Sequence, residues 1–238
     1  MRGQYDDSCK SSKGGHMTET VEYAELQYGW EKAYQDQNAG PLWQEDPIPV
    51  IPQAIDALKQ RNTHTVVDLG CGDGRNLAAL ADAGFNALGV DIAPTGLAHA
   101  RRVIKQRSFL LRADATKLPL IDASVDAVTC FDVFGQIQDP SHLIAEARRI
   151  VAPGGLFVTN AFTLEDGTYG EGDEIAPHTF AYKDTLFRYY SEDEMRGLFS
   201  DWTIHEIRRI SWDDPPHGDF RPYPHTHDNW VVYATPQD

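Results

Sequence analysis

Short apolar runs alternate with amphipathic stretches through the middle of this 238-residue chain. An apolar run between turn-forming residues is typical of a buried strand, and apolar residues three or four positions apart are typical of a helix that faces a core. The runs predict strands at about 65–69, 86–91, 108–112, 125–131 and 155–161. Helices are expected between them, at about 75–83, from Pro94 onward and from Asp139-Pro140 onward. Strands that alternate with helices favour an α/β domain with a parallel sheet.

The two ends of the chain differ from this middle part. Residues 1–17 lack periodicity and end in a sequence similar to a cloning junction, so they are expected to be a disordered or tag-like tail. Residues 18–62 are expected to form a helical arm, with helices at about 22–37 and 52–61. Residues 63–238 form the main expected domain, with a helix opened by the capping box Ser191–Glu194 and strands at about 202–210 and 229–235. Segments 163–190 and 212–228 are expected to be insertions at the carboxyl edge of the sheet.

A glycine-rich turn follows the first predicted strand. Residues 68–74 read DLGCGDG, and glycine tolerates the positive φ angles and the close ligand approach that such a turn requires. At the end of a first parallel strand, this turn would floor a nucleotide-type pocket. Asp91 ends the second predicted strand, where this architecture places an acid for the hydroxyls of a ribose. Arg75 stands where a dinucleotide-binding motif has its third glycine, which disfavours an NAD-type oxidoreductase.

Composition narrows the class of protein. A hydrophobic content of 41% and a charged content of 24% are those of a globular domain, and no apolar run approaches the ~20 residues of a membrane span. The formal charge of -15 argues against nucleic acid as the main partner. Cys9, Cys71 and Cys130 are far apart and odd in number, so they imply no disulfide framework. We expect a cytoplasmic protein away from membranes, and both a monomer and a homodimer stay open.

Four ordered phrases resemble the class I S-adenosylmethionine (SAM)-dependent methyltransferases. They are the acid with GxGxG at 68–74, Asp114-Ala115 after the third strand, residues 120–128 before the fourth, and residues 152–158 before the fifth. The resemblance implies a Rossmann-like fold, with a mostly parallel seven-stranded sheet, an antiparallel last strand and helices on both faces. It also implies SAM as the cofactor. The cofactor-binding residues that it implies are Trp30, Trp43, Asp68, Leu69, Gly70, Cys71, Gly72, Asp91, Ile92, Asp114, Ala115 and Phe131.

The flanking segments are similar to those of thiopurine-type and tellurite-resistance-type methyltransferases, which act on small molecules. The likeness rests on FAYKDTLFRYY at 180–190, on Arg75-Asn76, and on the aromatic residues Trp30, Tyr34 and Trp43 of the arm. In these families the arm covers the cofactor, and an aromatic face beside the sulfonium cation is favourable. An aromatic stripe that only packs the arm on the domain stays an alternative. The likeness leaves the acceptor open, because no His directly precedes Arg221 as in the tellurite-type pattern.

The second insertion is rich in histidine. His217, His225 and His227, with Asp219 and Asp228, suit a metal site, a substrate pocket with an acid–base group, or a polar rim. We expect the substrate pocket and no metal, with candidate catalytic residues Arg188, Arg221, His225 and His227. Arg or His would position an anionic acceptor, and a His base would serve a hydroxyl or amine, so the reacting atom stays open. A non-catalytic SAM-binding regulator is the alternative from another class.

Overall fold

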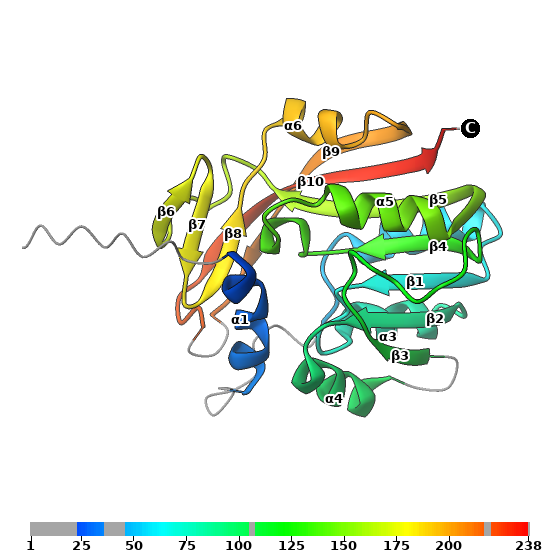
Figure 1. The fold of residues 1–238 in the computed structure, drawn as a ribbon, viewed down its shortest axis with the longest axis horizontal. Coiled ribbons are helices and arrows are strands. Elements are labelled where there is room, and N and C mark those ends of the chain that lie inside the picture. Colours follow the sequence, from blue (N-terminus) through cyan, green and yellow to red (C-terminus); the bar gives the residue numbers. More distant parts are fainter. Residues whose placement is uncertain (1–22, 36–45, 105–107, 217–219, 238) are drawn as a thin grey trace, which may run out of the picture.

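The structure is a computed structural model that describes residues 23–35, 46–104, 108–216 and 220–237. A central sheet carries helices on both faces, and a small second sheet lies at one end of it (Figure 1). The central strands are β1 (Thr65–Leu69), β2 (Asn86–Asp91), β3 (Ser108–Arg112), β4 (Val125–Cys130), β5 (Val151–Phe162), β9 (Trp202–Asp214) and β10 (His225–Pro236). The helices are α1 (Tyr23–Gln35), α2 (Ile51–Gln60), α3 (Arg75–Asp82), α4 (Pro94–Val103), α5 (Ser141–Ile150), α6 (Glu192–Leu198) and the 3-10 helix η2 (Phe134–Gln136).

The strand order of the central sheet is β3-β2-β1-β4-β5-β10-β9. Strands β1 to β5 pair in parallel, and β10 runs antiparallel to both of its neighbours. The predicted seven-stranded sheet with an antiparallel last strand is confirmed. Because the order reverses between β1 and β4, a crevice opens beyond the carboxyl ends of these strands, where α/β proteins bind their ligands.

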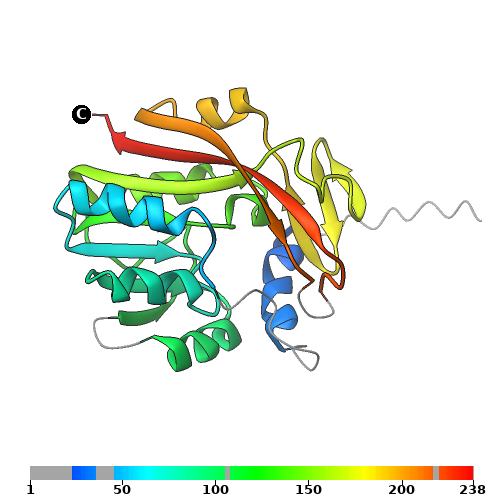
Figure 2. The same ribbon diagram turned by 180° about the vertical axis from the view of Figure 1, so that it is seen from behind.

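Burial on both faces explains why the central strands are continuous apolar runs in the sequence. On one face, α5 and α6 cover a cluster that includes Leu143 and Met195. On the other face, α2 and α3 cover a cluster that includes Leu58 and Leu77, and Figure 2 shows these two helices in front of the sheet. None of the helices in the described ranges is both long and apolar enough to cross a membrane.

The insertion at 163–190 contains a three-stranded antiparallel sheet that the sequence analysis did not predict. Its strands are β6 (Asp173–Ala176), β7 (Thr179–Tyr182) and β8 (Thr185–Arg188). Lys183 and Asp184 join β7 to β8 with φ angles of 48° and 62°, as in a two-residue hairpin turn with both residues in the left-handed region. The small sheet and α1 share a third buried cluster, of which the main members are Tyr34, Phe162, Phe180, Phe187, Tyr189 and Phe220. Both elements therefore lie over the carboxyl edge of the central sheet (Figure 1).

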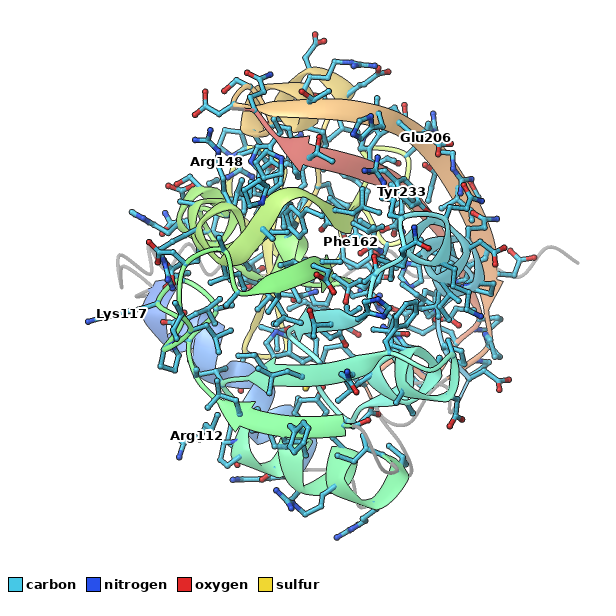
Figure 3. The ribbon with its side chains drawn as sticks, turned by 90° about the vertical axis from the view of Figure 1, so that its right-hand side faces the viewer. Arg112, Lys117, Arg148, Phe162, Glu206 and Tyr233 are labelled. Atoms are coloured by element: carbon cyan, nitrogen blue, oxygen red, sulfur yellow. The ribbon has the colours of Figure 1, made fainter. Side chains whose placement is uncertain are left out.

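Strands β9 and β10 are longer than predicted, and both extend into the segment 212–228. Strand β9 continues to Asp214, and β10 begins at His225. His225 pairs with Asp214, and His227 pairs with Trp212. Figure 3 shows the opposite end of the same pair, where Tyr233 of β10 lies beside Glu206 of β9. The two histidines therefore lie on a strand with a fixed register.

Candidate functional site

The turn between β1 and α3 forms the floor of a cleft at the carboxyl edge, which we call the glycine-turn cleft. Gly70, Gly72 and Gly74 have φ angles of 72°, 52° and 90°, which residues with a side chain rarely adopt. The amides of Gly70 and Cys71 donate to the carbonyl oxygen of Val90 at 2.8 and 3.1 Å. A Cβ atom at Gly72 would collide with the hydroxyl of Tyr34, so glycine also permits the close approach of α1.

Asp91 ends β2 directly beside this turn. Its Oδ2 accepts from the amide of Gly72, and its Oδ1 accepts from the amide of Ala93, both at 2.8 Å. Burial raises the pKa of Asp91, although the amide hydrogen bonds act in the opposite direction. The amide of Ile92 also acts on this carboxylate, which has about four lone-pair sites in all, so acceptor capacity is left for a ligand hydroxyl. Asp91 thus ties the turn to the next loop and offers acceptors to the cleft.

The glycine-turn cleft brings together most of the predicted cofactor-binding residues. Those that line it are Trp30, Gly70, Cys71, Gly72, Asp91, Ile92, Ala115 and Phe131. Asp68, Leu69 and Asp114 do not line it, and Trp43 lies outside the described residues. The Asp114 carboxylate accepts from the amide and hydroxyl of Thr116 at 2.8 and 2.7 Å. Lining residues that sequence reasoning missed include Asp73, Thr116, Val133, Gln136 and Ile137, of which the last three belong to the segment after β4.

Asp68 lies under the turn and gives a testable pH dependence. It is buried, its Oδ1 accepts from the hydroxyl of Thr129 at 2.7 Å, and burial raises its pKa to about 7. In the unfolded chain an aspartate titrates near about 3.9, so the folded protein holds an extra proton between these two values. Stability contributed by this group is therefore present at low pH and is lost as the pH rises through this window.

Asp68→Asn accepts the same hydrogen bond without ionising. We expect its free energy of unfolding at pH 8 to exceed that of the wild type by up to about 4 kcal/mol, because a difference of one pKa unit between the folded and unfolded states corresponds to about 1.4 kcal/mol. The gain should vanish at pH 4, where Asp68 is protonated in the folded protein. Urea unfolding of both proteins at the two pH values measures this difference. An equal difference at pH 4 and pH 8 would contradict the burial argument.

Side chains of helix α1 hold it over the cleft through contacts with α4 and with the small sheet. Glu31 accepts from the amide and the hydroxyl of Thr95 at 3.0 and 2.6 Å, which joins α1 to the first turn of α4. Burial would raise the pKa of Glu31, but the Thr95 hydrogen bonds lower it below its ordinary value. On the other side, the Trp30 ring lies 6.3 Å from Phe187 and 5.6 Å from Phe220. Trp30 therefore contacts the small sheet while it lines the cleft.

A second cavity of about 300 Å³ adjoins the glycine-turn cleft. Arg75, Asp132 and Gln136 line both spaces, so the two meet at these residues. Arg75 Nη2 lies 3.2 Å from Asp132 Oδ2, and Asn160 donates to Asp132 Oδ1 at 2.8 Å. The rest of the wall is formed by Asp46, Pro47, Ile48, Pro49, Phe162, Phe187, Trp212, Asp213, Asp214, Pro215, Arg221 and His227.

Arg221 supplies a buried positive charge to the second cavity. Its side chain is 1% exposed, and its guanidinium carbon lies 4.9 Å from the ring of Phe187 and 5.7 Å from that of Tyr182. Its Nε lies 3.3 Å from Glu171 Oε2, and its Nη2 has no hydrogen-bond partner among the described residues. A buried guanidinium with a free N–H group is suited to bind an anionic ligand group.

The structure brings His225 and His227 together beside the second cavity. His227 lines the second cavity, stacks on Phe162 at 5.3 Å between ring centroids, and lies 3.1 Å from His225 between the two Nε2 atoms. Burial would raise the pKa of Asp166, but its hydrogen bond with His227 helps to hold that pKa below its ordinary value. Asp166 lies 61 residues before His227 in sequence, and no motif connects them.

The remaining candidates lie elsewhere. Arg188 lines neither cavity: it donates to the carbonyl oxygen of Gln138 at 2.8 Å and lies 3.5 Å from Glu194. Asp228 accepts from the side chains of Thr163, Arg209 and Ser211. His217 and Asp219 lie outside the described residues.

Known proteins similar to this chain share its central domain. Residues 67–159 match a family model described as "Methyltransferase domain". The chain is 33% identical over 144 residues to a "Probable S-adenosylmethionine-dependent methyltransferase" of Mycolicibacterium smegmatis, which covers 55% of this chain and 56% of that protein. This chain spans between about a third and just over half of the length of the first curated relatives that it matches.

Solved structures share the fold over most of the chain. A SAM-dependent methyltransferase from Methanosarcina mazei is 17% identical, with a TM-score of 0.65, over 81% of this chain and 100% of that one. The 1,6-didemethyltoxoflavin-N1-methyltransferase of Burkholderia thailandensis was solved with 1,6-didemethyltoxoflavin and S-adenosylhomocysteine bound. It is 20% identical, with a TM-score of 0.64, over 90% of this chain and 88% of that one.

Proposed function

We propose that this chain transfers a methyl group from SAM to a small molecule bound in the second cavity, because residues 67–159 match a methyltransferase-domain family and the chain is similar to a SAM-dependent methyltransferase. The observation that carries this proposal is the buried Arg221 guanidinium in a cavity that shares its wall with the glycine-turn cleft. A regulator that only binds SAM would need neither the adjoining cavity nor a buried cation within it. The small molecule bound in the Burkholderia neighbour is consistent with an acceptor of this size.

The wall of the second cavity suggests the chemical class of the acceptor. Phe162, Phe187 and Trp212 offer apolar ring surfaces, and Arg221 offers N–H donors to an anion. Ligand pockets usually range from about 300 to 1,000 Å³, so this cavity is at the small end. The acceptor that fits best is therefore a compact, flat molecule with an anionic group such as a carboxylate, phenolate or thiolate.

The chain's own residues would mainly bind and align the reactants. Methyl transfer is an in-line displacement at a carbon that the sulfonium has already activated, so proximity and orientation supply most of the acceleration. Asp91 would hold the ribose hydroxyls, and Trp30 would lie near the sulfonium, where an aromatic face favours a cation. The methyl group would pass between the two spaces beside Arg75 and Asp132, while Arg221 holds the anionic end of the acceptor.

A transfer assay tests the proposal. Purified protein is incubated with methyl-labelled SAM and a panel of hydroxybenzoates, thiophenols and heteroaromatic acids, with uncharged analogues of equal size as matched controls. We expect label in anionic members and little in their uncharged analogues. SAM binding without transfer to any member would favour the regulator, and preferential transfer to the uncharged analogues would contradict the role of Arg221.

Helix α1 is proposed to act as a lid on the cofactor. We expect Glu31→Ala to weaken SAM binding about tenfold, because a charge-assisted contact to Thr95 that holds the lid closed contributes about 1.5–3 kcal/mol. Isothermal titration with SAM measures the effect. Glu192→Ala on α6, far from the cleft, is the matched control and should bind SAM like the wild type. Unchanged affinity in Glu31→Ala would leave α1 as packing alone.

A further inference from the structure

Two histidines and an aspartate meet where β9 and β10 reach the second cavity. His225 and His227 are two residues apart on β10, so their side chains lie on one face of the strand. Asp214 is the register partner of His225 on β9, which places its carboxylate on that face as well. The Nε2 atoms of the two histidines are 3.1 Å apart. Asp214 Oδ2 lies 3.9 Å from His225 Nε2 and 3.7 Å from His227 Nε2. Three atoms of the kind that bind metals therefore converge.

The other ring nitrogen of each histidine is anchored on the outer side. His225 Nδ1 lies 3.2 Å from the carbonyl oxygen of Tyr223, which only accepts hydrogen bonds. His227 Nδ1 lies 3.1 Å from Asp166 Oδ2, which also accepts from the amide of Asp228. Both Nδ1 atoms therefore donate, and each neutral imidazole directs the Nε2 lone pair inward. Metal-binding histidines are held in this way by carbonyl and carboxylate partners.

Three acceptors that face one another favour a cation between them. A proton shared by the two imidazoles would not reach Asp214, because 3.7 Å is too long for a hydrogen bond. We propose that Asp214, His225 and His227 bind one divalent transition-metal ion, for which zinc is the reference. Two imidazoles and one carboxylate suit zinc and iron(II). The sequence analysis weighed a metal site with Asp219 and Asp228 and expected none, and the register that brings in Asp214 is visible only in the fold.

The distances fit such an ion after a small movement. Zinc binds imidazole nitrogen at about 2.0–2.1 Å, which sets two ligand atoms about 2.9 Å apart at a right angle and about 3.4 Å apart at a tetrahedral angle. The Nε2–Nε2 distance of 3.1 Å lies within this range. The Asp214 oxygen would need to approach by about 0.3–0.5 Å to reach the same range. The Asp214 side chain is 15% exposed, at the edge of the cavity, where a side-chain rotation of this size is feasible.

The position of the site suggests what the ion would do. Asp214 and His227 line the second cavity, so the ion would face a bound acceptor. Three protein ligands leave at least one coordination position for an oxygen of that acceptor. The ion and Arg221 would then hold two oxygen-bearing groups of one molecule, such as the hydroxyl and the carboxylate of a hydroxy acid. This role rests on the proposed methyl transfer, whereas metal binding itself does not.

Calorimetric titration of the full chain with zinc, after treatment with EDTA and its removal, tests the site. We expect one ion per wild-type chain, and binding weaker by at least about 100-fold in the double variant His225→Ala/His227→Ala. Asp166→Asn keeps all three ligands and should weaken binding about 10–100-fold, the range for an outer partner of a ligating histidine. His205→Ala is the matched control: it removes an imidazole from the far end of β9 and should bind zinc like the wild type.

SAM titration of the same variants separates this inference from the proposed function. Lost zinc binding with full SAM affinity supports the metal site. No zinc binding by the wild type, or equal binding by the double variant, overturns the metal site and leaves the proposed methyl transfer standing. If the double variant fails to fold, Asp214→Asn at the cavity edge decides: at least tenfold weaker zinc binding supports the site, and unchanged binding overturns it.

Discussion

Replacing Arg221 by alanine is expected to lower kcat/KM for an anionic acceptor by about 100-fold or more. A hydrogen bond to a charged group contributes about 1.5–3 kcal/mol, and truncating one partner of a buried charge pair costs about 2–5 kcal/mol. Arg221 is buried, lines the second cavity and carries an N–H group for which no described residue is an acceptor. SAM affinity should change little, because Arg221 does not line the glycine-turn cleft. Steady-state kinetics with varied acceptor, and titration with SAM, measure the two quantities.

Two further arginine variants make this test specific. Arg221→Lys keeps the charge but cannot bind an anion in the bidentate geometry of a guanidinium, so it should recover part of the lost kcat/KM. Partial recovery would show that the loss in Arg221→Ala does not come from a folding defect. Arg188→Ala is the matched control, because Arg188 donates to the carbonyl oxygen of Gln138 outside both cavities. We expect its kcat/KM to stay within a few-fold of the wild type. A larger loss in Arg188→Ala than in Arg221→Ala would contradict the placement of the acceptor.

Asp91→Ala is expected to weaken SAM binding by about 100-fold or more. Two ribose hydroxyls that donate to a carboxylate contribute about 1.5–3 kcal/mol each, and both would be lost. The variant also removes the carboxylate that accepts hydrogen bonds from the amides of Gly72 and Ala93. Isothermal titration with SAM and with S-adenosylhomocysteine measures the loss.

Asp193→Ala is the matched control for this second result, since Asp193 is an exposed acid on α6, away from the cleft. It should bind SAM like the wild type. Circular dichroism should show Asp91→Ala folded, because the strand core beneath the turn does not depend on this carboxylate. Retained SAM affinity in folded Asp91→Ala, or preferential binding of NAD by the wild type, would rule out the assignment of the cleft.

The sequence was most informative where local pattern and burial agree. Strands β1 to β3 begin and end where the apolar runs predict, although β1 is largely buried and the edge strand β3 is only partly buried. Gly70, Gly72 and Gly74 have the positive φ angles that three alternate glycines imply. The capping box is also confirmed, with Ser191 accepting from the Glu194 amide. In each case the determining interactions lie within a few residues of one another.

The sequence did not predict features that depend on residues far apart in the chain. The pairing of β7 with β8 begins at a hairpin turn formed by Lys183 and Asp184, without the glycine or asparagine that usually marks such a turn. Arg221 is buried against Glu171, 50 positions before it in the chain, and Asp214 faces His225 only because of the β9–β10 register. Histidine spacing alone revealed His225 and His227 but not the third member of their cluster.

The structure of the protein bound to S-adenosylhomocysteine tests the central claim most directly. We expect the ribose hydroxyls on Asp91, the adenine between Ile92 and Ala115, and the sulfur beside the residues shared by the two spaces, Arg75, Asp132 and Gln136. The position of the transferred methyl group would then face Arg221 across the second cavity. Binding of the ligand outside the glycine-turn cleft, or with its sulfur directed away from the second cavity, would contradict this account.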